Sequence, residues 1–364
     1  MKAFANIKSR YAEYKALDSA DKAKAWKEGL INNAIYLLII IAVIYTYTQN
    51  SRFLSVASIV NIISLSAANI PIACGIAGTI VLTGTDLSAG RVVGLTACIS
   101  ASLLQSVTYA TKIFPDLPVL PIPLVILIVI VVGGIVGWVN GFFVAKFHLH
   151  PFIVTLAGMF FARGMTTIVH TDPFNVQNKA FVALKDTRVI VPGMGSVNRI
   201  GKYVDAYVEI GVIVALLIVV LMFVMLRWSK LGRAFYAVGG NKQSALMLGI
   251  NVKRTRFLAQ LFSGVLAGIA GYVYFLHVGS GSASHATGME MNAIASSIIG
   301  GTLLTGGVGN IIGTFFGVLS LSTIQNIVSS AGLDQAWWTG ITIAAMLCLF
   351  LVIQSIVMAR KNRG

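Results

Sequence analysis

Long apolar runs separated by short polar segments dominate the chain from residue 30 onward. A helix needs about 20 apolar residues to cross the hydrocarbon layer of a membrane. By that measure the pattern predicts ten membrane-spanning helices, at 30–49, 56–83, 90–110, 119–145, 151–170, 207–228, 257–278, 291–305, 311–330 and 337–358. The second run is long enough to be broken or strongly tilted around Pro71 and Gly75. The eighth is short and rich in glycine, which predicts a half-span.

Composition agrees with this pattern. Of the 364 residues, 57% are hydrophobic and only 11% are charged, which is too few charges to cover the surface of a soluble protein of this size. The predicted fold class is therefore an all-α integral membrane protein. Cys74, Cys98 and Cys348 all lie inside apolar runs, so they indicate neither a disulfide framework nor a metal site.

Basic residues are concentrated in a few segments, and these set the orientation of the spans. Seven Lys or Arg precede residue 29, seven lie between Arg227 and Arg256, and three lie in the last five residues. Ten spans place all three segments on one side, so both termini are expected in the cytoplasm. The net charge of +15 then reflects topology rather than nucleic-acid binding. The predicted organisation is a cytoplasmic tail at 1–29, a transmembrane domain at 30–358 and a cytoplasmic tail at 359–364.

The longest outer loop covers residues 171–206 and mixes polar residues with the stretch VIVPGMG. This composition predicts a short interfacial helix and an extended piece. Loops of this length usually carry a function or are disordered. We expect it to form a docking surface for a partner on the outer side.

Glycines repeat every four residues in three of the spans, a spacing that lets helix backbones approach closely in a membrane. This pattern predicts a compact bundle and indicates no activity. The repeats are Gly133, Gly137 and Gly141; Gly264 and Gly268; and Gly309, Gly313 and Gly317.

A polar, basic segment at 229–256 separates two of the most apolar runs. Asn241 is a residue type that caps helix N-termini, and Gly249 suits the position just after a helix, where φ > 0 is favourable for glycine. Gly239 and Gly240 precede this helix and predict a flexible or tight turn. The pattern predicts a short amphipathic helix parallel to the membrane. The alternative is a simple positive-inside loop, but such a loop needs no cap at each end.

Within this segment, GRAFYAVGGNKQSALMLGINV at 232–252 resembles the cytoplasmic loop of permease subunits from bacterial ATP-binding-cassette sugar importers, the ribose, xylose and galactose class. In that family the loop contains a coupling helix that seats in a groove of the ATPase subunit. Ser244–Ala245 stands where many relatives have two alanines. The resemblance implies an ATPase-coupling role for the matching residues Gly232, Arg233, Ala237, Gly239, Gly240, Asn241, Ala245, Gly249 and Ile250.

Two more stretches carry the resemblance. GTDLSAGRVVGL at 84–95 resembles the family's Gly-x-Asp-Leu-Ser-x-Gly motif in the wording typical of galactose/methyl-galactoside permeases. GMEMNAIASSIIGGTLLTGGVGNIIGT at 288–314 is also similar, but Asn292 stands where relatives usually have Asp, which puts in doubt any role that needs charge there. The likeness covers nearly the whole chain after Phe53 and is weakest in the N-terminal tail and the outer loop.

Polar residues inside the spans are candidates for a translocation path, because intramembrane charges are costly and are functional candidates by default. Asp86 and Ser88 either form a gate beside a water-lined path or cap the third span. Arg163 either lines the path or snorkels to the membrane surface. Aromatic faces such as those of Phe142 or Trp138 can hold a passing sugar weakly. The candidate path or gate residues are Asp86, Ser88, Gly90, Asn140, Thr155, Arg163, Glu290 and Asn292. Asn140, Thr155 and Asn292 either offer hydrogen bonds to a passing sugar or join neighbouring helices, since polar side chains also bond across helix bundles.

The resemblance implies a multi-pass permease of the bacterial inner membrane that passes a monosaccharide through a pore formed with a second copy. The chain lacks the Gly-x₄-Gly-Lys-Ser/Thr pattern, so it cannot cradle nucleotide phosphates and we expect no enzyme activity or cofactor of its own. ATP and Mg²⁺ are expected on a partner ATPase, fused in tandem or paired. A periplasmic or lipoprotein sugar-binding protein is the other expected partner. The expected substrate is galactose, methyl-galactoside or glucose, with ribose, xylose or a nucleoside as the alternative.

Two other classes of function are weighed against this one. An ion-coupled secondary transporter usually carries several intramembrane acids, whereas Asp86 is nearly alone. An intramembrane hydrolase can be built from Ser282 or Ser284 with His277 or His285. The HLH stretch at 148–150 has no third metal ligand nearby and is expected to form an interfacial turn.

Overall fold

The computed structural model describes residues 55–107, 109, 112–197, 203–330 and 336–361, together with residues 44, 47 and 48. The tail expected at 1–29, most of the span expected at 30–49 and the end of the tail expected at 359–364 lie outside the described residues. The chain divides into two compact units, Ser51–Asn326 and a unit made of Met1–Asn50 with Ile327–Gly364. Helix α16 (Ala336–Lys361) belongs to the second unit and covers the last span, predicted at 337–358.

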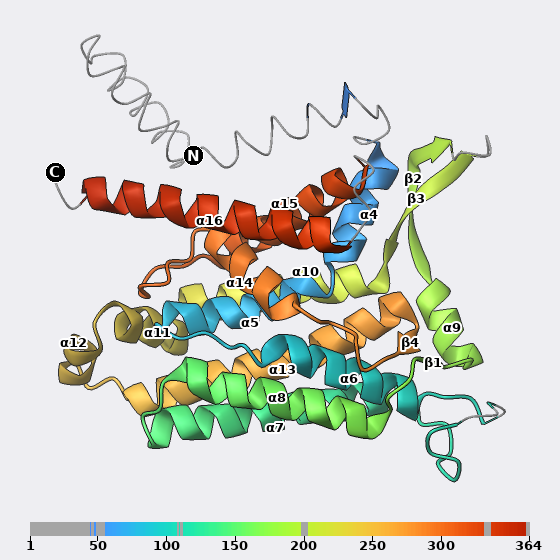
Figure 1. Ribbon diagram of the computed structural model, residues 1–364, viewed down its shortest axis with the longest axis horizontal. Coiled ribbons are helices and arrows are strands. Elements are labelled where there is room, and N and C mark those ends of the chain that lie inside the picture. The colour runs from blue at the N-terminus through green and yellow to red at the C-terminus, as the bar shows by residue number, and fades with distance from the viewer. Residues whose placement is uncertain are drawn as a thin grey trace. The chain divides into compact units, whose positions relative to one another are not determined.

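The unit Ser51–Asn326 is built almost entirely of helices, as the apolar pattern predicts. The helices are α4 (Val56–Ser66), α5 (Asn69–Val81), α6 (Ala89–Leu103), α7 (Ile122–Lys146), α8 (Pro151–Val169), α9 (Lys179–Asp186), α10 (Ile210–Trp228), α11 (Lys230–Gly240), α12 (Lys242–Met247), α13 (Val252–Val278), α14 (Met289–Ile299) and α15 (Ile311–Ser330), which continues beyond the unit. Helices α11 and α12 lie at one end of the unit, and α9 lies at the opposite end (Figure 1).

Among the described residues, five helices are long and apolar enough to cross a membrane: α7, α8, α10, α13 and α15. The α4–α5 pair makes a sixth candidate if it is counted as one bent span. Helices α6, with 15 residues, and α14, with 11, are shorter than a full span requires. The short α14 agrees with the predicted half-span, whereas the count of ten spans stays a prediction.

The second span is broken, but the predicted position of the break is wrong. Helices α4 and α5 meet at a bend of 51°, and the bend lies at residues 67–68 rather than around Pro71 and Gly75. Pro71 is the third residue of α5, where a missing N–H leaves no intrahelical hydrogen bond unmade. Gly75 lies in the middle of α5 and does not break it. A glycine is favoured there by packing, because a Cβ would come within 3.1 Å of the Ser263 Cα.

Helix α5 is the central element of the core. Every residue from Ile70 to Val81 is buried, as expected for a helix that is apolar on all sides. The long helix α13 packs against α5, α6 and α7. Thus the helices that hold the functional candidates are fixed against one another by a continuous apolar core.

Helices α7 and α13 approach each other closely, and the glycine repeats explain it. A Cβ on Gly264 would overlap the Gly133 carbonyl oxygen and come within 2.6 Å of the Gly137 Cα. Likewise, a Cβ on Gly317 of α15 would overlap the Ser296 carbonyl oxygen of α14. The predicted small-residue contacts are confirmed, and in the α7–α13 contact two of the repeats face each other.

The outer loop contains the short helix and the extended piece that its composition predicts. Helix α9 is capped by Asn178, whose side-chain oxygen accepts the N–H of Ala180 at 2.9 Å. Strands β2 (Arg188–Val197) and β3 (Tyr203–Glu209) form an antiparallel pair. Strands β1 (Phe174–Asn175) and β4 (Ser280–Gly281) form a second short antiparallel pair.

Candidate functional site

The predicted coupling helix is present as α12, and both of its predicted ends are confirmed. The Asn241 side-chain oxygen accepts the N–H of Ser244 at 2.9 Å and caps the first turn. Gly249 has φ +76°, the left-handed conformation that ends the helix. The Ile250 N–H donates to the Ala245 carbonyl oxygen at 3.0 Å and closes the C-terminal turn. The short helix is therefore held at each end by local hydrogen bonds.

Three consecutive apolar residues at the C-terminal end of α12 are exposed, although Ala245 is not. Ala245 is buried and anchors the helix. Leu246, Met247 and Leu248 are 53%, 81% and 79% exposed. We call these three residues the α12 knob. Three adjacent exposed apolar side chains on a capped turn are typical of a surface that another protein or the membrane covers.

Gly239 and Gly240 do not form the predicted turn; they are the last turn of α11. The prediction fails because Gly239 serves packing instead. A Cβ on Gly239 would overlap the Val81 carbonyl oxygen at the end of α5 and come within 2.8 Å of the Gly307 nitrogen. The Gly307 N–H donates to that same carbonyl at 2.8 Å. Gly240, in contrast, has open space where its Cβ would lie.

The first part of the coupling segment folds back on the end of α10. Ser229 caps α11 by accepting the N–H of Gly232 at 2.9 Å. A Cβ on Gly232 would overlap the Leu226 carbonyl oxygen, so a larger residue does not fit the turn between α10 and α11. Arg233 is exposed and donates to the Trp228 carbonyl oxygen at 3.1 Å. The start of α11 is therefore packed and hydrogen-bonded to the end of α10, and α12 follows α11 directly.

Asp86 lies at the centre of a buried hydrogen-bond network that joins three segments of the chain. Its Oδ1 accepts the Ser88 hydroxyl at 2.6 Å and the Ser88 N–H at 3.0 Å. Its Oδ2 accepts the Ser263 hydroxyl of α13 at 2.6 Å. The Asn140 amide of α7 donates to the Ser88 Oγ at 2.9 Å. We call Asp86, Ser88, Asn140 and Ser263 the Asp86 network; all four residues are buried.

This geometry combines parts of both interpretations of Asp86. The Ser88 N–H belongs to the residue that precedes α6, so Asp86 does satisfy a backbone donor at the helix start. The side chain also ties the segment between α5 and α6 to α7 and α13. The Ser88 hydroxyl makes no capping hydrogen bond to the backbone of α6. Whether the network also acts as a gate stays a prediction.

Helix α8 supports the Asp86 network from the other side. Thr155 is buried, and its hydroxyl lies 2.9 Å from the Pro151 carbonyl oxygen and 3.3 Å from the Thr85 carbonyl oxygen. A Cβ on Gly158 would come within 2.8 Å of the Asn140 Oδ1. Thr155 is therefore brought to the network through the backbone next to Asp86.

Gly90 and Glu290 form a second contact at the start of α6. Glu290 is 6% exposed, and a Cβ on Gly90 would overlap its Oε2 and lie 2.6 Å from its backbone nitrogen. Arg91, the next residue, donates to the Thr287 hydroxyl at 3.0 Å. Asn292 is half-buried, and its carbonyl oxygen accepts the Ser296 hydroxyl at 2.7 Å. Gly90 is thus a site of close packing against α14.

Arg163 joins neither the Asp86 network nor the contact between Gly90 and Glu290. It is exposed on α8, and the neighbouring Phe160 and Phe161 are 59% and 61% exposed. This face of α8 therefore points away from the described residues. Trp138 and Phe142 stack on each other at 5.6 Å on α7, and Trp138 is half-exposed.

The sequence did not single out Ser263, the α13 member of the Asp86 network. A serine in an apolar helix normally bonds to its own backbone, so its type gives no signal. Its neighbour Gly264 was the only hint, since close helix contact brings adjacent side chains to the partner helix.

The groups proposed for a hydrolase do not assemble a catalytic unit among the described residues. Ser282 and Ser284 hydrogen-bond to each other at 2.9 Å. His277 instead lies 2.9 Å from the Glu209 Oε2, and the His285 Nδ1 has no hydrogen-bond partner. Within the described ranges, no group of three His, Cys, Asp or Glu residues could hold a metal ion.

Comparison with known proteins gives matches along almost the whole chain. The family described as branched-chain amino acid transport system / permease component matches residues 51–351. The galactose/methyl galactoside import permease protein MglC of Escherichia coli (strain K12) is 32% identical, over 94% of this chain and 100% of its own length. The fructose import permease protein FruG of Bifidobacterium longum (strain NCC 2705) is 33% identical, over 94% and 97%. The inner membrane ABC transporter permease protein YjfF of Escherichia coli (strain K12) is 33% identical, over 86% and 88%. No solved structure matches the chain.

Proposed function

The chain belongs to the permease-component family of ABC sugar importers, and on that premise we propose that it carries galactose or methyl galactoside across the bacterial inner membrane. Energy comes from ATP hydrolysis by a partner subunit that binds ATP and Mg²⁺. The chain itself supplies the path and no catalytic group. Its long apolar helices are those of a multi-pass membrane protein.

The observation that carries this proposal is the α12 knob. A capped helix end that exposes three apolar side chains offers a surface for a protein partner, and α12 lies in the segment that resembles the coupling loop of the family. The partner ATPase would cover Leu246, Met247 and Leu248. Gly232, Arg233, Asn241, Gly249 and Ile250 would shape and hold the knob, while Ala245 anchors it.

Packing around Gly239 supports a route by which movement of α12 would reach the Asp86 network. Movement of α12 would pass to α11, because the two helices are consecutive. The last turn of α11 touches the end of α5 at Val81, and the segment after Val81 leads directly to Asp86. The Asp86 network then connects to α7 and α13. ATP-driven movement of α12 would in this way favour one arrangement of the network over another.

The path residues are proposed from the way they converge around the start of α6. Asp86, Ser88, Asn140 and Thr155 converge, and Gly90 with Glu290 forms a nearby contact, so a rearrangement at the start of α6 would affect both groups. Arg163 and Asn292 would line the path only in the assembled pore, which we propose to form with a second copy of this chain. A periplasmic or lipoprotein sugar-binding protein would deliver the sugar.

The choice of sugar is the most specific part of the proposal. One relative is named for galactose and methyl galactoside import, and another is named for fructose import. The motif at 84–95 has the galactoside-type wording, which favours galactose or methyl galactoside over ribose, xylose or a nucleoside. Purifying the sugar-binding protein encoded beside this chain and identifying the sugar that it retains tests the assignment directly.

The coupling role is tested by placing a charge on the α12 knob. Met247→Asp should weaken binding of the ATPase subunit by about 30-fold or more, as at an interface hot spot, without changing the fold. Ile190→Asp is the matched control, because Ile190 is also an exposed apolar residue, at 59%, but lies on β2. Binding would be measured with detergent-solubilised chain and purified ATPase subunit. Undiminished binding to the Met247→Asp variant would disprove the docking role.

The transfer of movement from α11 to α5 is tested with a pair of glycine variants. Gly239→Ala should leave ATPase binding intact but reduce sugar uptake per ATP hydrolysed, since its Cβ would overlap the Val81 carbonyl. Gly240→Ala should keep uptake near the parent rate, because nothing lies within 4 Å of its Cβ position. Equal uptake by both variants in proteoliposomes would contradict the route through α5.

A further inference from the structure

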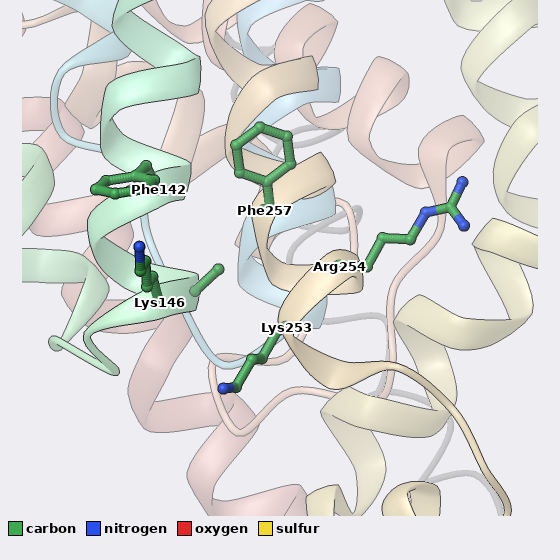
Figure 2. A pocket seen from close by; sticks show the side chains of 6 residues that line it. Phe142, Lys146, Lys253, Arg254 and Phe257 are labelled. Carbon is green, nitrogen blue, oxygen red and sulfur yellow. The ribbon is translucent and has the colours of Figure 1, made fainter.

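A groove between the ends of α7 and α13 combines an apolar floor with a basic rim. It encloses about 250 Å³, and its lining residues are Phe142, Ala145, Lys146, Lys253, Arg254 and Phe257. Figure 2 shows the Lys146 and Lys253 side chains on the α7 side of the groove, while the Arg254 guanidinium extends the other way. Two cations from distant parts of the sequence therefore line the same groove.

Close helix packing creates this arrangement. Gly141 lets α7 approach α13 so closely that a Cβ there would lie 2.8 Å from the Phe257 carbonyl oxygen. Ala145 is buried beneath the rim, and the rings of Phe142 and Phe257 are half-buried. The floor of the groove is consequently built of carbon and offers no hydrogen-bonding side chain.

The surroundings of the groove are those of a membrane surface. The Phe142 ring stacks on Trp138 at 5.6 Å and meets Phe147 edge-on at 5.7 Å. Trp138 and Phe147 are 50% and 55% exposed. Exposed aromatic clusters at the end of an apolar helix are typical of the lipid headgroup level. With α7 spanning a membrane in the predicted orientation, the groove would open where hydrocarbon and headgroups meet.

The cations at the rim have no acidic partner among the described residues. Lys146, Lys253 and Arg254 are all exposed, and none of them forms an ion pair there. The Lys146 ammonium instead lies 5.2 Å from the centre of the Phe142 ring. A negatively charged ligand would meet uncompensated positive charge at this rim.

We propose that this groove binds an anionic phospholipid, with its phosphate at Lys146 and Lys253 and an acyl chain against Phe142 and Phe257. A soluble anion would satisfy the rim alone, and a neutral lipid would satisfy the floor alone. A lipid with an anionic headgroup matches both parts. The site depends on the chain lying in a membrane and is independent of which sugar is carried.

The test compares retention of phosphatidylglycerol and phosphatidylcholine with identical acyl chains by the detergent-purified chain, measured by native mass spectrometry. Phosphatidylglycerol should be retained preferentially. Lys146→Gln and Lys253→Gln should each weaken its retention about fivefold, the effect of one basic residue near an anionic surface. Phe257→Ala should weaken it as well. Lys230→Gln, which removes an exposed lysine from α11, is the charge-matched control and should retain the lipid normally.

Three results would overturn the proposal: equal retention of both lipids, unchanged phosphatidylglycerol retention in the Lys146→Gln/Lys253→Gln variant, and full displacement of the lipid by inorganic phosphate. If that variant retains the lipid unchanged and loses binding to the ATPase subunit, the rim belongs to the protein partner instead. Thermal unfolding of every variant confirms that each comparison is made on folded protein.

Discussion

Single residues in this protein differ sharply in how far the sequence predicts their surroundings. Asn241 and Gly249 were predicted to end a short helix, and both do, because helix caps depend on atoms only a few residues away. Gly239 was predicted to form a turn and instead packs on Val81, more than 150 residues earlier in the chain. Local hydrogen bonding is legible from sequence, whereas the need for a small residue at a distant contact is not.

Asp86 gives the sharpest prediction at this scale. Asp86→Ala leaves the hydroxyls of Ser88 and Ser263 and the Ser88 N–H without their buried acceptor. We expect a loss of about 1–3 kcal/mol in stability for each buried donor left unsatisfied, and a large drop in sugar uptake. Thermal unfolding and proteoliposome uptake measure the two effects.

Asp172→Ala is the control for this variant, because Asp172 is exposed in the outer loop. It should leave both stability and uptake near the parent values. If Asp86→Ala unfolds at a lower temperature but its folded fraction transports at the parent rate, Asp86 only holds the helices together and is not a gate element.

At the scale of elements, the glycine repeats matter because two helices present them to each other. The α7–α13 contact requires glycine on both sides, since either backbone occupies the space of a side chain on the other. The same contact brings Asn140 and Ser263 to Asp86 and forms the basic groove about one turn further along α7. One packing motif therefore positions two separate candidate sites.

Gly264→Ala tests this contact. The added Cβ would overlap the Gly133 carbonyl oxygen, so α7 and α13 must separate, at a cost of about 1–3 kcal/mol. Gly134→Ala is the control on α7, because its Cβ would only touch the Val265 Cγ2 at an ordinary 3.4 Å. We expect a lower unfolding temperature in detergent for Gly264→Ala alone; equal temperatures for the two variants would refute the close contact.

The outer elements are joined to the helices by Glu209 and His277. The Glu209 Oε2 lies 2.9 Å from the His277 Nδ1, linking the end of β3 to the last turn of α13. The pKa of Glu209 is lowered, first by its hydrogen bond with His277 and then by the positive charges of His277, Arg188 and Lys185, against a rise from burial. A lowered pKa in the folded state means that the ionised carboxylate stabilises the fold.

This stabilisation should depend on pH in one direction. It is present above the pKa of an unfolded glutamate and is lost as pH falls through the lower, folded-state pKa of Glu209. Glu209→Gln should therefore lose stability near neutral pH and show a weaker decline toward acid. Unfolding temperatures across an acid-to-neutral series measure this, with Asp186→Asn, an exposed carboxylate on α9, as the control. A Glu209→Gln profile parallel to that of the parent would contradict the linkage.

At the scale of the whole molecule, orientation in the membrane follows from charge rather than from packing. Basic residues gather around α11 and α12, while α9 and the β2–β3 pair belong to the loop expected outside. Helices α11 and α12 lie at the opposite end from α9, as the predicted orientation requires (Figure 1). The ten spans and the cytoplasmic termini remain predictions.

Cysteine labelling tests the orientation. In a Cys348→Ser background, Lys242→Cys should react with a membrane-impermeant thiol reagent only in inside-out vesicles, and Lys179→Cys only in right-side-out vesicles. The buried Cys74 and Cys98 should stay unreactive in both. Labelling of Lys242→Cys from the outer side would reverse the topology and remove α12 from the reach of a cytoplasmic ATPase.

The sequence by itself determined the membrane class, the expected sidedness, the family resemblance and the caps of α12. Each of these depends on composition, charge or contacts only a few residues apart. Tertiary structure decided the bend before Pro71, the packing of Gly239 on α5, the union of Asp86 with Ser263, and the groove shared by Lys146 and Lys253. These depend on which helices become neighbours, and that is set by the summed packing of many small contacts rather than by any one local pattern.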